Sequence, residues 1–544
     1  MIPDRSARGR AAAPVADPVG DVPGARAVGF RKADHPNCSA ILFDNLARDP
    51  GAVAVTGPAG TRTYAELCAE AAAWGRAFRA AGLERGERIA FVLDDTPAFP
   101  AAFFGAVRAG FVPVLLNTQT GRDLLTFFVE DSGAPLALCD AAFAPLFRAG
   151  DVRTLVVANG EGPSWSLSAA AFLAGHAGDL PMADTGPDDM AFWMYSSGST
   201  GRPKGIVHLH HDMAYTAATY SEHVLGVRPG DRLFSAPKLF FAYGFGNGIT
   251  FPFAAGASAV LMPGQPRAAA VLDAIERFRP TMLFGLPTLY TGLCRAPDAS
   301  ARDLSSLRLT LSAAETLSED VARAWRDLSG CEAVEGLGST EMLHIYLSNR
   351  PGDARPGSVG APVPGYEVKL CDADGAEVPA GAEGVMWVRG HSSAPHYWNR
   401  SDKTAETMRG DWIHTGDRFV ARGGAFHFQG RADDLVKVSG QWVWPLEVER
   451  CLAEHPHVHE CAVLADRLPD RRTALRAVVR LRGGHAADAE QTRALREFVK
   501  DRLLPFKAPR SIEYVDALPH TGTGKIDRRA LASAGAGATS EGAP

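Results

Sequence analysis

The sequence lacks several features that would assign it to a common functional class. Its eight cysteines include no C-x-x-C pair, so we expect reduced, mostly buried thiols and neither a disulfide scaffold nor a zinc site. The formal net charge of -6 disfavours nucleic-acid binding, which depends on Lys and Arg placed at phosphates. The first thirty residues lack the apolar core of a signal peptide. These absences together predict a cytoplasmic protein.

A membrane span is disfavoured for similar reasons. The only long run without charge is 239–262, LFFAYGFGNGITFPFAAGASAVLM, which has the length of a membrane-spanning helix. Four glycines and Pro252 interrupt this run, and a broken helix exposes backbone groups that lipid cannot satisfy. We therefore expect a buried strand, a loop and a short helix around a ligand pocket, and no membrane. The sequence also has no coiled-coil heptads that would indicate a protein partner.

Strand-like and helical segments alternate through most of the 544 residues. Thr63 and Glu66 form a capping box before an apolar helical pattern, and further helices are expected at 98–109 and before Cys331. Apolar strands between them indicate parallel sheets covered by helices, whereas the segment after about residue 424 is a smaller α+β unit. The predicted fold is α/β, with a large N-terminal domain of helix-covered sheets and a small mobile C-terminal domain. The predicted boundaries are a disordered tail at 1–30, the N-terminal domain at 31–430, the C-terminal domain at 431–531 and a second tail at 532–544.

The segment 195–205, YSSGSTGRPKG, has the composition of a phosphate-binding loop. Backbone N–H groups of a glycine-rich turn form an anion site, Ser and Thr hydroxyls add donors, and Lys204 adds charge. It differs from the nucleotide-binding P-loop, because no hydroxyl follows the lysine and Pro203 precedes it. It lies between two apolar segments, AFWMY and GIVHL, and this position disfavours a solvated linker.

Four further motifs have residue types suited to nucleotide chemistry. In the segment 336–341, GLGSTE, Thr340 can bond a phosphate oxygen and Glu341 can hold Mg²⁺, which commonly takes one or two carboxylates plus phosphate oxygens. An acidic residue after a tight turn, as in HTGD at 414–417, suits a ribose diol. GRADD at 430–434 and TGTGK at 521–525 are polar and glycine-containing. Each motif alone is more typical of a surface turn than of a site.

In this order and spacing, the five motifs strongly resemble those of the adenylate-forming superfamily, which comprises acyl-CoA synthetases, adenylation domains and firefly luciferase. The resemblance covers about residues 40–531. Within the superfamily the chain looks most like the benzoate-CoA ligases, because KLFFAYGFGNGITFP, GLGSTEMLHIYLSN and AGFVPVLLNT are similar to theirs nearly residue for residue. The resemblance implies two half-reactions. A carboxylate first attacks the α-phosphorus of Mg·ATP and releases pyrophosphate, and a thiol then displaces AMP from the acyl-adenylate.

The resemblance also implies a role for each motif residue. Lys525 would bridge the carboxylate and the α-phosphate, Thr340 would contact the α-phosphate and Glu341 would bind the metal. The C-terminal domain would rotate between the half-reactions about a hinge at Asp433, and Gly440 would then line the thiol tunnel. The remaining nucleotide contacts would be Ser196, Ser197, Gly198, Ser199, Thr200, Gly201 and Lys204 at the β- and γ-phosphates, Ala313, Ala314 and Glu315 at the adenine, and Asp417 and Arg431 at the ribose.

One position departs from the superfamily pattern. Related ligases usually read S-A-G-E where this chain reads Ser312-Ala-Ala-Glu315. Ala314 therefore adds a methyl group where the backbone is expected to approach the adenine.

The acid implied by the resemblance is a small aromatic carboxylate. A flat, mostly apolar slot closed by an aromatic ring suits benzoate, and Ala242 cannot pair with the ammonium of an α-amino acid. Tyr243 or His344 could also bond a ring hydroxyl or amine. The expected lining is Ala242, Tyr243, Gly338, His344 and Ile345.

The sequence leaves the thiol acceptor open. CoA is the leading candidate, and the alternative is the phosphopantetheine arm of an acyl or aryl carrier protein. Both acceptors share the pantetheine group, so the predicted tunnel does not distinguish them. A non-catalytic protein that retained the fold is disfavoured, because Lys204, Glu341, Asp417 and Lys525 are all present.

Overall fold

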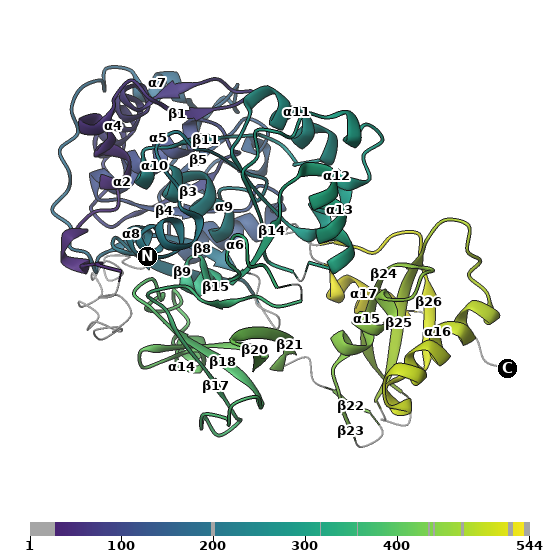
Figure 1. The fold of residues 1–544 in the computed structure, drawn as a ribbon. Helices are drawn as coiled ribbons and strands as arrows, with labels where there is room; N and C mark the ends of the chain where they lie inside the picture. The colour runs from purple at the N-terminus through teal and green to yellow at the C-terminus, as the bar shows by residue number, and fades with distance from the viewer. Residues whose placement is uncertain are drawn as a thin grey trace. The chain divides into compact units, whose positions relative to one another are not determined.

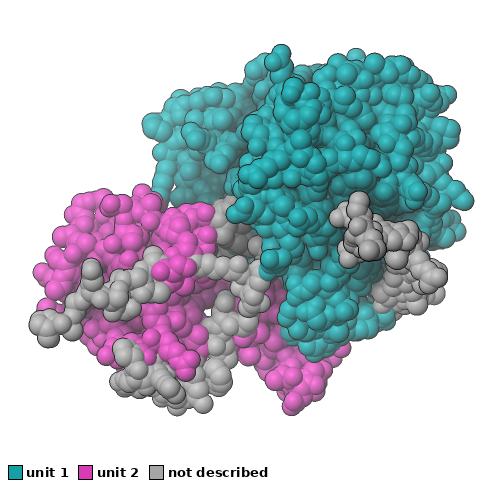
Figure 2. Space-filling model, turned by 180° about the vertical axis from the view of Figure 1, so that it is seen from behind, with its two compact units in different colours: residues 1–368, 387–414 teal, residues 369–386, 415–544 magenta. Residues whose placement is uncertain are grey.

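The fold is described from a computed structural model of the chain. The structure describes residues 28–196, 202–315, 317–355, 357–432, 436–438, 441–468, 473–520 and 526–537. The chain divides into two compact units, shown in two colours in Figure 2. Unit 1 is Met1–Val368 with Trp387–His414, and unit 2 is Lys369–Met386 with Thr415–Pro544. The division crosses three strands, β17 (Glu367–Cys371), β18 (Glu383–Arg389) and β20 (Trp412–Arg422).

The first sheet of unit 1 has the strand order β7-β6-β5-β3-β4-β8-β9. Every neighbouring pair is parallel except the β8–β9 hairpin, which is antiparallel. The strands are β3 (Arg88–Val92), β4 (Val112–Leu115), β5 (Leu136–Cys139), β6 (Thr154–Val157), β7 (Leu167–Ser168), β8 (Met190–Ser196) and β9 (Lys204–Leu209). The helices that alternate with them are α4 (Tyr64–Ala80), α5 (Ala98–Ala109), α6 (Arg122–Ser132), α7 (Ala169–Leu173) and α8 (Asp212–Thr216).

The second sheet of unit 1 has the order β16-β15-β14-β13-β12-β10-β11-β1-β2. Its strands are β1 (Val53–Thr56), β2 (Arg62–Thr63), β10 (Arg232–Ser235), β11 (Ser258–Val260), β12 (Met282–Gly285), β13 (Leu309–Ser312), β14 (Ala333–Gly338), β15 (Ile345–Ser348) and β16 (Ala361–Pro362). Three helices pack beside one another along this sheet (Figure 1): α11 (Ala268–Phe278), α12 (Pro287–Cys294) and α13 (Glu319–Ser329). Their apolar faces bury Trp325 and Tyr290 against the strands, because each helix has one apolar stripe that must be removed from water.

The uncharged run at 239–262 is not one helix. It forms α9 (Ala242–Phe245), the π-helical turn η4 (Gly246–Thr250), α10 (Phe251–Ala255) and β11. Among the described residues, no helix is both long and apolar enough to cross a membrane. Another π-helical segment, η3 (Ala217–Leu225), follows α8, and the short helices α2 (Ala40–Phe43) and α3 (Asn45–Arg48) precede β1. The single 3-10 turns are η1 (Lys32–Asp34), η2 (Ala144–Leu146), η5 (Ala299–Ala301), η6 (Thr340–Met342) and η8 (Pro505–Lys507).

A five-stranded sheet has the order β17-β18-β20-β19, with β21 paired to β20. Its further strands are β17 (Glu367–Cys371), β19 (Met408–Arg409) and β21 (Ala425–Arg431), and α14 (Ser401–Thr407) precedes β19. The rest of unit 2 is a two-stranded sheet of β22 and β23, a three-stranded sheet of β24, β25 and β26, and their helices. These elements are β22 (Val436–Val438), β23 (Gln441–Val443), α15 (Pro445–Ala453), β24 (Val458–Arg467), β25 (Thr473–Leu481), α16 (Ala489–Arg502), β26 (Ser511–Tyr514) and α17 (Arg528–Gly537).

Several predictions from the sequence can be compared with this fold. The mixed α/β architecture is confirmed, and the capping box of Thr63 and Glu66 begins α4 as expected. All eight cysteines are free thiols, of which Cys294 and Cys331 are half-buried and the other six are buried. Helix α17 extends to Gly537, into the segment predicted as a C-terminal tail, and residues 1–27 and 538–544 lie outside the described residues.

Candidate active site

The hairpin of β8 and β9 carries the predicted phosphate loop. Ser196 and Lys204 are cross-strand partners at the end of the hairpin where the loop begins and ends. The hairpin is fixed on one side by Tyr195, whose hydroxyl donates to Asp131 Oδ2 at 2.6 Å. The backbone N–H of Trp398 also donates to the carbonyl of Gly205, at 2.8 Å. The predicted phosphate contacts between the strands lie outside the described residues; they are Ser197, Gly198, Ser199, Thr200 and Gly201.

Glu341 and Lys204 meet at one aromatic ring. The Tyr397 hydroxyl donates to Glu341 Oε1 at 2.8 Å, and Lys204 Nζ lies 4.2 Å from the centroid of the Tyr397 ring. The ring thus holds a carboxylate at its hydroxyl and a cation over its face, an arrangement favoured by the ring quadrupole. Tyr397, which was not predicted from the sequence, thus brings together a predicted phosphate contact, Lys204, and the predicted metal ligand, Glu341.

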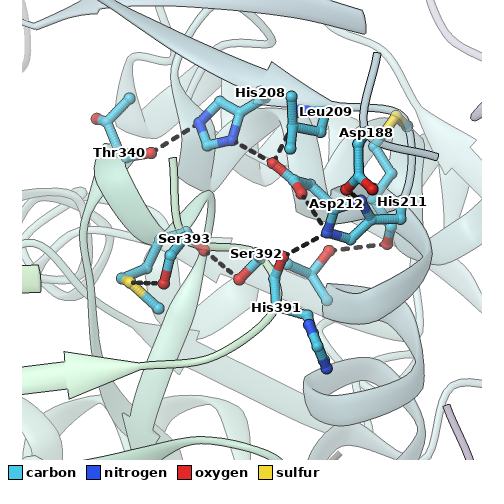
Figure 3. A network of polar contacts seen from close by, with 12 residues as sticks. Asp188, His208, Leu209, His211, Asp212, Thr340, His391, Ser392 and Ser393 are labelled. Carbon is cyan, nitrogen blue, oxygen red and sulfur yellow. Dashed lines mark hydrogen bonds and ion pairs between the residues drawn. The ribbon is translucent and has the colours of Figure 1, made fainter. Parts of the chain in front are cut away.

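The turn that bears Thr340 and Glu341 is strongly constrained. It is the single 3-10 turn η6, which follows β14 and ends at Leu343 with a φ of 62°. Such a φ is costly for a non-glycine residue and persists only where surrounding contacts determine it. Three successive carbonyls of the turn accept hydrogen bonds from other segments, and Figure 3 shows the one from His208 to Thr340. These bonds are His208 Nε2–H to Thr340 O at 2.9 Å, Ala394 N–H to Glu341 O at 2.7 Å and Ser392 Oγ–H to Met342 O at 2.9 Å.

The segment predicted to line the adenine follows β13. Ala313 is buried, and Ala314 has a φ of 74°, in the left-handed region that favours glycine. The departure from the S-A-G-E pattern therefore has a backbone consequence in addition to the extra methyl group, because the alanine is strained at this φ. The Ser312 hydroxyl is buried and has no hydrogen-bond partner among the described residues, so it remains available to a ligand. Glu315 follows in the same loop.

The residues predicted to line the aryl slot come from α9 and the β14–β15 hairpin. Gly338 is the register partner of Ile345, and a Cβ on Gly338 would lie 2.3 Å from the His344 carbonyl oxygen. Only glycine therefore allows the two strands to approach here. Tyr243 lies next to His344, with ring centroids 5.5 Å apart. Ala242 is buried at the start of α9. Three of the other predicted aryl contacts adjoin His344: Tyr243 contacts its ring, Gly338 lies against its carbonyl, and Ile345 follows it in sequence.

His344 is a neutral, buried side chain. It is 2% exposed, and burial lowers the pKa of its imidazole to about 3, with a smaller opposing effect from the hydrogen bond to Tyr243. Nε2 therefore carries the proton and donates to the Tyr243 carbonyl at 3.2 Å. Nδ1 is left as an acceptor without a partner among the described residues. Tyr220 and Phe251 also contact the ring, at centroid distances of 5.4 Å and 4.6 Å.

The predicted ribose-binding pair lies in unit 2. Asp417 on β20 and Arg431 on β21 are register partners, and Arg431 Nη1 donates to Asp417 Oδ1 at 3.2 Å. Asp417 follows Gly416, whose φ of 74° turns the strand after Thr415. The structure thus brings these two residues together within unit 2. The predicted hinge Asp433, tunnel residue Gly440 and lysine Lys525 lie outside the described residues.

The described residues could supply only part of the coordination shell of a magnesium ion. Within the described ranges, no three His, Cys, Asp or Glu side chains are grouped to hold a metal. Mg²⁺ usually keeps several waters and is bound by one or two carboxylates plus substrate phosphates, so a preformed protein cage is not required. Glu341, half-buried and oriented by Tyr397, supplies a carboxylate of this kind.

Comparison with known proteins agrees with this geometry. The sequence matches the AMP-binding enzyme family over residues 42–398 and the AMP-binding enzyme C-terminal domain over residues 447–525. It is 44% identical to the benzoate--CoA ligase of Thauera aromatica over 90% of this chain and 94% of that protein. The structure resembles the anthranilate CoA ligase AuaEII in complex with anthranoyl-AMP, with a TM-score of 0.88, 36% identity and coverage of 94% of this chain and 100% of that one. It also resembles a benzoate CoA ligase from Burkholderia xenovorans, with a TM-score of 0.84, 38% identity and coverage of 91% and 99%. The chain therefore belongs to the AMP-binding enzyme family.

Proposed function

We propose that the chain activates benzoate or a substituted benzoate with ATP and transfers the aroyl group to CoA. The reaction is an AMP-forming acid–thiol ligation through an aroyl-adenylate. The observation that carries the proposal is the arrangement within unit 1. The neutral, buried His344, whose ring contacts Tyr243, lies in the same β14–β15 segment as the Thr340–Glu341 turn, so an aryl carboxylate and a nucleotide phosphate would meet there.

The first half-reaction needs positioning and neutralisation of charge, and no enzyme nucleophile. The aryl carboxylate oxygen would attack the α-phosphorus, and the bond to pyrophosphate would break. Lys204 and Ser196, at the loop end of the hairpin, would contact the β- and γ-phosphates together with residues 197–201. Thr340 would contact the α-phosphate. When bound, Mg²⁺ would supply further neutralisation of phosphate charge, and Glu341 would hold it.

The second half-reaction replaces AMP by a thiol. The thiolate sulfur would attack the aroyl carbonyl carbon, and the bond between that carbon and the AMP oxygen would break. In this proposal, residues 431–531 form the C-terminal domain that moves between the halves, with its hinge at Asp433. Lys525 would serve the first half, and Gly440 would line the thiol tunnel in the second. Asp417 and Arg431 would bind the ribose.

CoA is the proposed thiol. The relatives described above carry CoA ligase names, so loading of a carrier protein is the less favoured alternative. A cytoplasmic location remains a prediction from the sequence.

The proposal is tested by ATP–pyrophosphate exchange with a panel of benzoates carrying hydrogen, fluorine, hydroxyl or amino substituents. We expect exchange with benzoate and with small substituents that fit beside Tyr243 and His344. CoA and a phosphopantetheinylated carrier protein would then compete for the adenylate, with aroyl-CoA as the expected product. Failure of every aryl acid to support exchange would disprove the proposed function.

A further inference from the structure

A buried histidine lies directly behind the Thr340–Glu341 turn. His208 is on β9, and Asp212 opens α8 four residues later. Both side chains are fully buried, at 0% exposure. His208 Nδ1 is 2.8 Å from Asp212 Oδ2, and His208 Nε2 is 2.9 Å from the carbonyl oxygen of Thr340 (Figure 3). One side chain therefore connects a buried carboxylate to the backbone of the turn.

The two partners of His208 fix the orientation of its ring. A carbonyl oxygen can only accept, so Nε2–H donates to the Thr340 carbonyl. At the other ring nitrogen, Nδ1 lies 2.8 Å from Asp212 Oδ2, which also accepts from the Leu209 N–H at 3.0 Å.

His211 extends the network to the other side of the turn. Its Nδ1 donates to the Pro187 carbonyl and its Nε2 to the His391 carbonyl, both at 2.8 Å. Nε2 is also 3.3 Å from Asp212 Oδ1. The segment that His211 fixes at His391 contains Ser392 and Ala394, which donate to the Met342 and Glu341 carbonyls. Asp212 therefore contacts both histidines: His208 donates to the turn itself, and His211 binds the segment that contains the other two donors.

We infer that His208 is a positioning residue for ATP, and that it acts by donating Nε2–H to the Thr340 carbonyl while Asp212 fixes its ring. This inference rests on the proposed function, in which Thr340 contacts the α-phosphate and Glu341 holds Mg²⁺. The His208 side chain does not touch the substrate in this assignment. It sets the direction of the Thr340–Glu341 peptide, and a displacement of about 1 Å at such a position can lower a rate by about a hundredfold.

Two substitutions separate the two hydrogen bonds of His208. His208→Asn places an amide nitrogen near the position of Nδ1, so it keeps a donor to Asp212 and loses the donor to Thr340. His208→Gln places an amide nitrogen near the position of Nε2, so it keeps the donor to Thr340 and loses the donor to Asp212. The second change leaves a fully buried carboxylate with one donor fewer, which destabilises a protein more than an unpaired carbonyl does.

The two variants are therefore expected to rank in opposite orders for stability and for function. His208→Gln should have the lower thermal midpoint, but an ATP affinity and an adenylation kcat within about threefold of the wild type. His208→Asn should be the more stable variant, with kcat lowered by roughly tenfold to a hundredfold and a weaker affinity for Mg·ATP. His208→Gln combined with Asp212→Asn provides a second comparison if His208→Gln does not fold, because the buried carboxylate is then neutral.

The measurements are Mg·ATP dissociation constants from isothermal titration calorimetry of the full chain, thermal midpoints, and ATP–pyrophosphate exchange with benzoate. Functional losses that follow the order of the thermal midpoints would overturn the inference, as would equal losses in the two variants. If the wild type binds Mg·ATP but exchanges with no aryl acid, the proposed function fails, and the calorimetric ranking alone decides the inference. A wild type that does not bind Mg·ATP would overturn both.

Discussion

Two buried histidines in unit 1 both donate a hydrogen bond from Nε2 to a backbone carbonyl, and they differ in what surrounds Nδ1. His208 and His344 each donate Nε2–H to a backbone carbonyl, that of Thr340 at 2.9 Å and that of Tyr243 at 3.2 Å. The Nδ1 of His208 faces the Asp212 carboxylate, whereas the Nδ1 of His344 has no partner among the described residues and its ring packs against aromatic side chains. The first environment stabilises a charged, polar turn for phosphates, and the second keeps a neutral ring suited to an apolar acid. A single adjacent carboxylate therefore decides which chemistry each histidine supports.

The largest effect is expected from a substitution of Glu341, in the turn to which His208 donates. Glu341→Gln keeps an acceptor for the Tyr397 hydroxyl but removes the carboxylate that would hold Mg²⁺. We expect adenylation to fall by about a hundredfold or more, since an electrostatic contact to the reacting phosphates is lost. Pyrophosphate exchange at saturating benzoate measures this loss, and the thermal midpoint should stay within about 2 °C. Tyr397→Phe is the control and should lose no more than about tenfold. If the two variants lost equal activity, Glu341 would not have the assigned role.

The second largest effect is expected from a substitution of His344, among the predicted aryl contacts. His344→Leu replaces the imidazole by an apolar side chain of similar volume. It removes the donor to the Tyr243 carbonyl and the acceptor Nδ1. We expect the KM for benzoate to rise by about tenfold, in the range of one altered pocket contact, with the KM for ATP unchanged. Steady-state kinetics with each substrate varied in turn measures both constants. A rise in the KM for ATP of the same size would remove the distinction between the two histidines.

The neutral state of His344 also has a pH-dependent consequence. Its folded pKa of about 3 lies below the ordinary value of 6.5, so the unfolded chain binds the proton first as the pH falls. Stability is present above about pH 6.5 and is lost toward pH 3, at up to about 1.4 kcal/mol per pH unit. His210, whose pKa is lowered to about 4 by burial, acts in the same direction. Thermal midpoints of the wild type and His344→Leu between pH 7 and about pH 5 should show a shallower slope in the variant. If the thermal midpoints of the wild type and His344→Leu fell equally with pH, the folded protein would bind a proton at His344 as readily as the unfolded chain does.

The smallest expected effect concerns the adenine segment. Ala314 has a φ of 74°, where an L-residue costs about 1–2 kcal/mol, partly offset by the greater chain entropy of glycine when unfolded. Ala314→Gly should therefore raise the thermal midpoint by about 1–2 °C and lower the KM for ATP slightly. Ala313→Gly is the matched control, because Ala313 is buried and is not among the residues with positive φ; it should lower the midpoint. A lower midpoint for both variants would show that strain at Ala314 is not the controlling factor.

The sequence predicted the local features of the fold well. The helix expected at 98–109 is α5 (Ala98–Ala109), and the box of Thr63 and Glu66 caps α4, because apolar spacing and capping are properties of neighbouring residues. The segment 239–262 was likewise predicted as broken and buried from its glycines and proline. Signals of this kind do not depend on the rest of the chain.

The contacts that organise the candidate site were not predictable in the same way. Tyr397 reaches Glu341 across 56 residues, and His208 reaches Thr340 across 132 residues. Both contacts depend on how separate sheets and loops meet, and no spacing in the sequence encodes that. The only local signal was the His208–Asp212 separation of four residues, which suits an interaction across one turn but does not identify the distant partner. The strain at Ala314 also became visible only with its backbone angle.

The three occupied carbonyls of the Thr340–Met342 turn have a thermodynamic consequence for nucleotide exchange. Their donors belong to the protein itself, so the turn is ordered at the time of folding and does not wait for ATP. Binding of the nucleotide therefore loses little backbone entropy at this turn, and release of AMP recovers little. If Thr340 contacts the α-phosphate as proposed, departure of AMP then depends mainly on the loss of contacts elsewhere around the nucleotide.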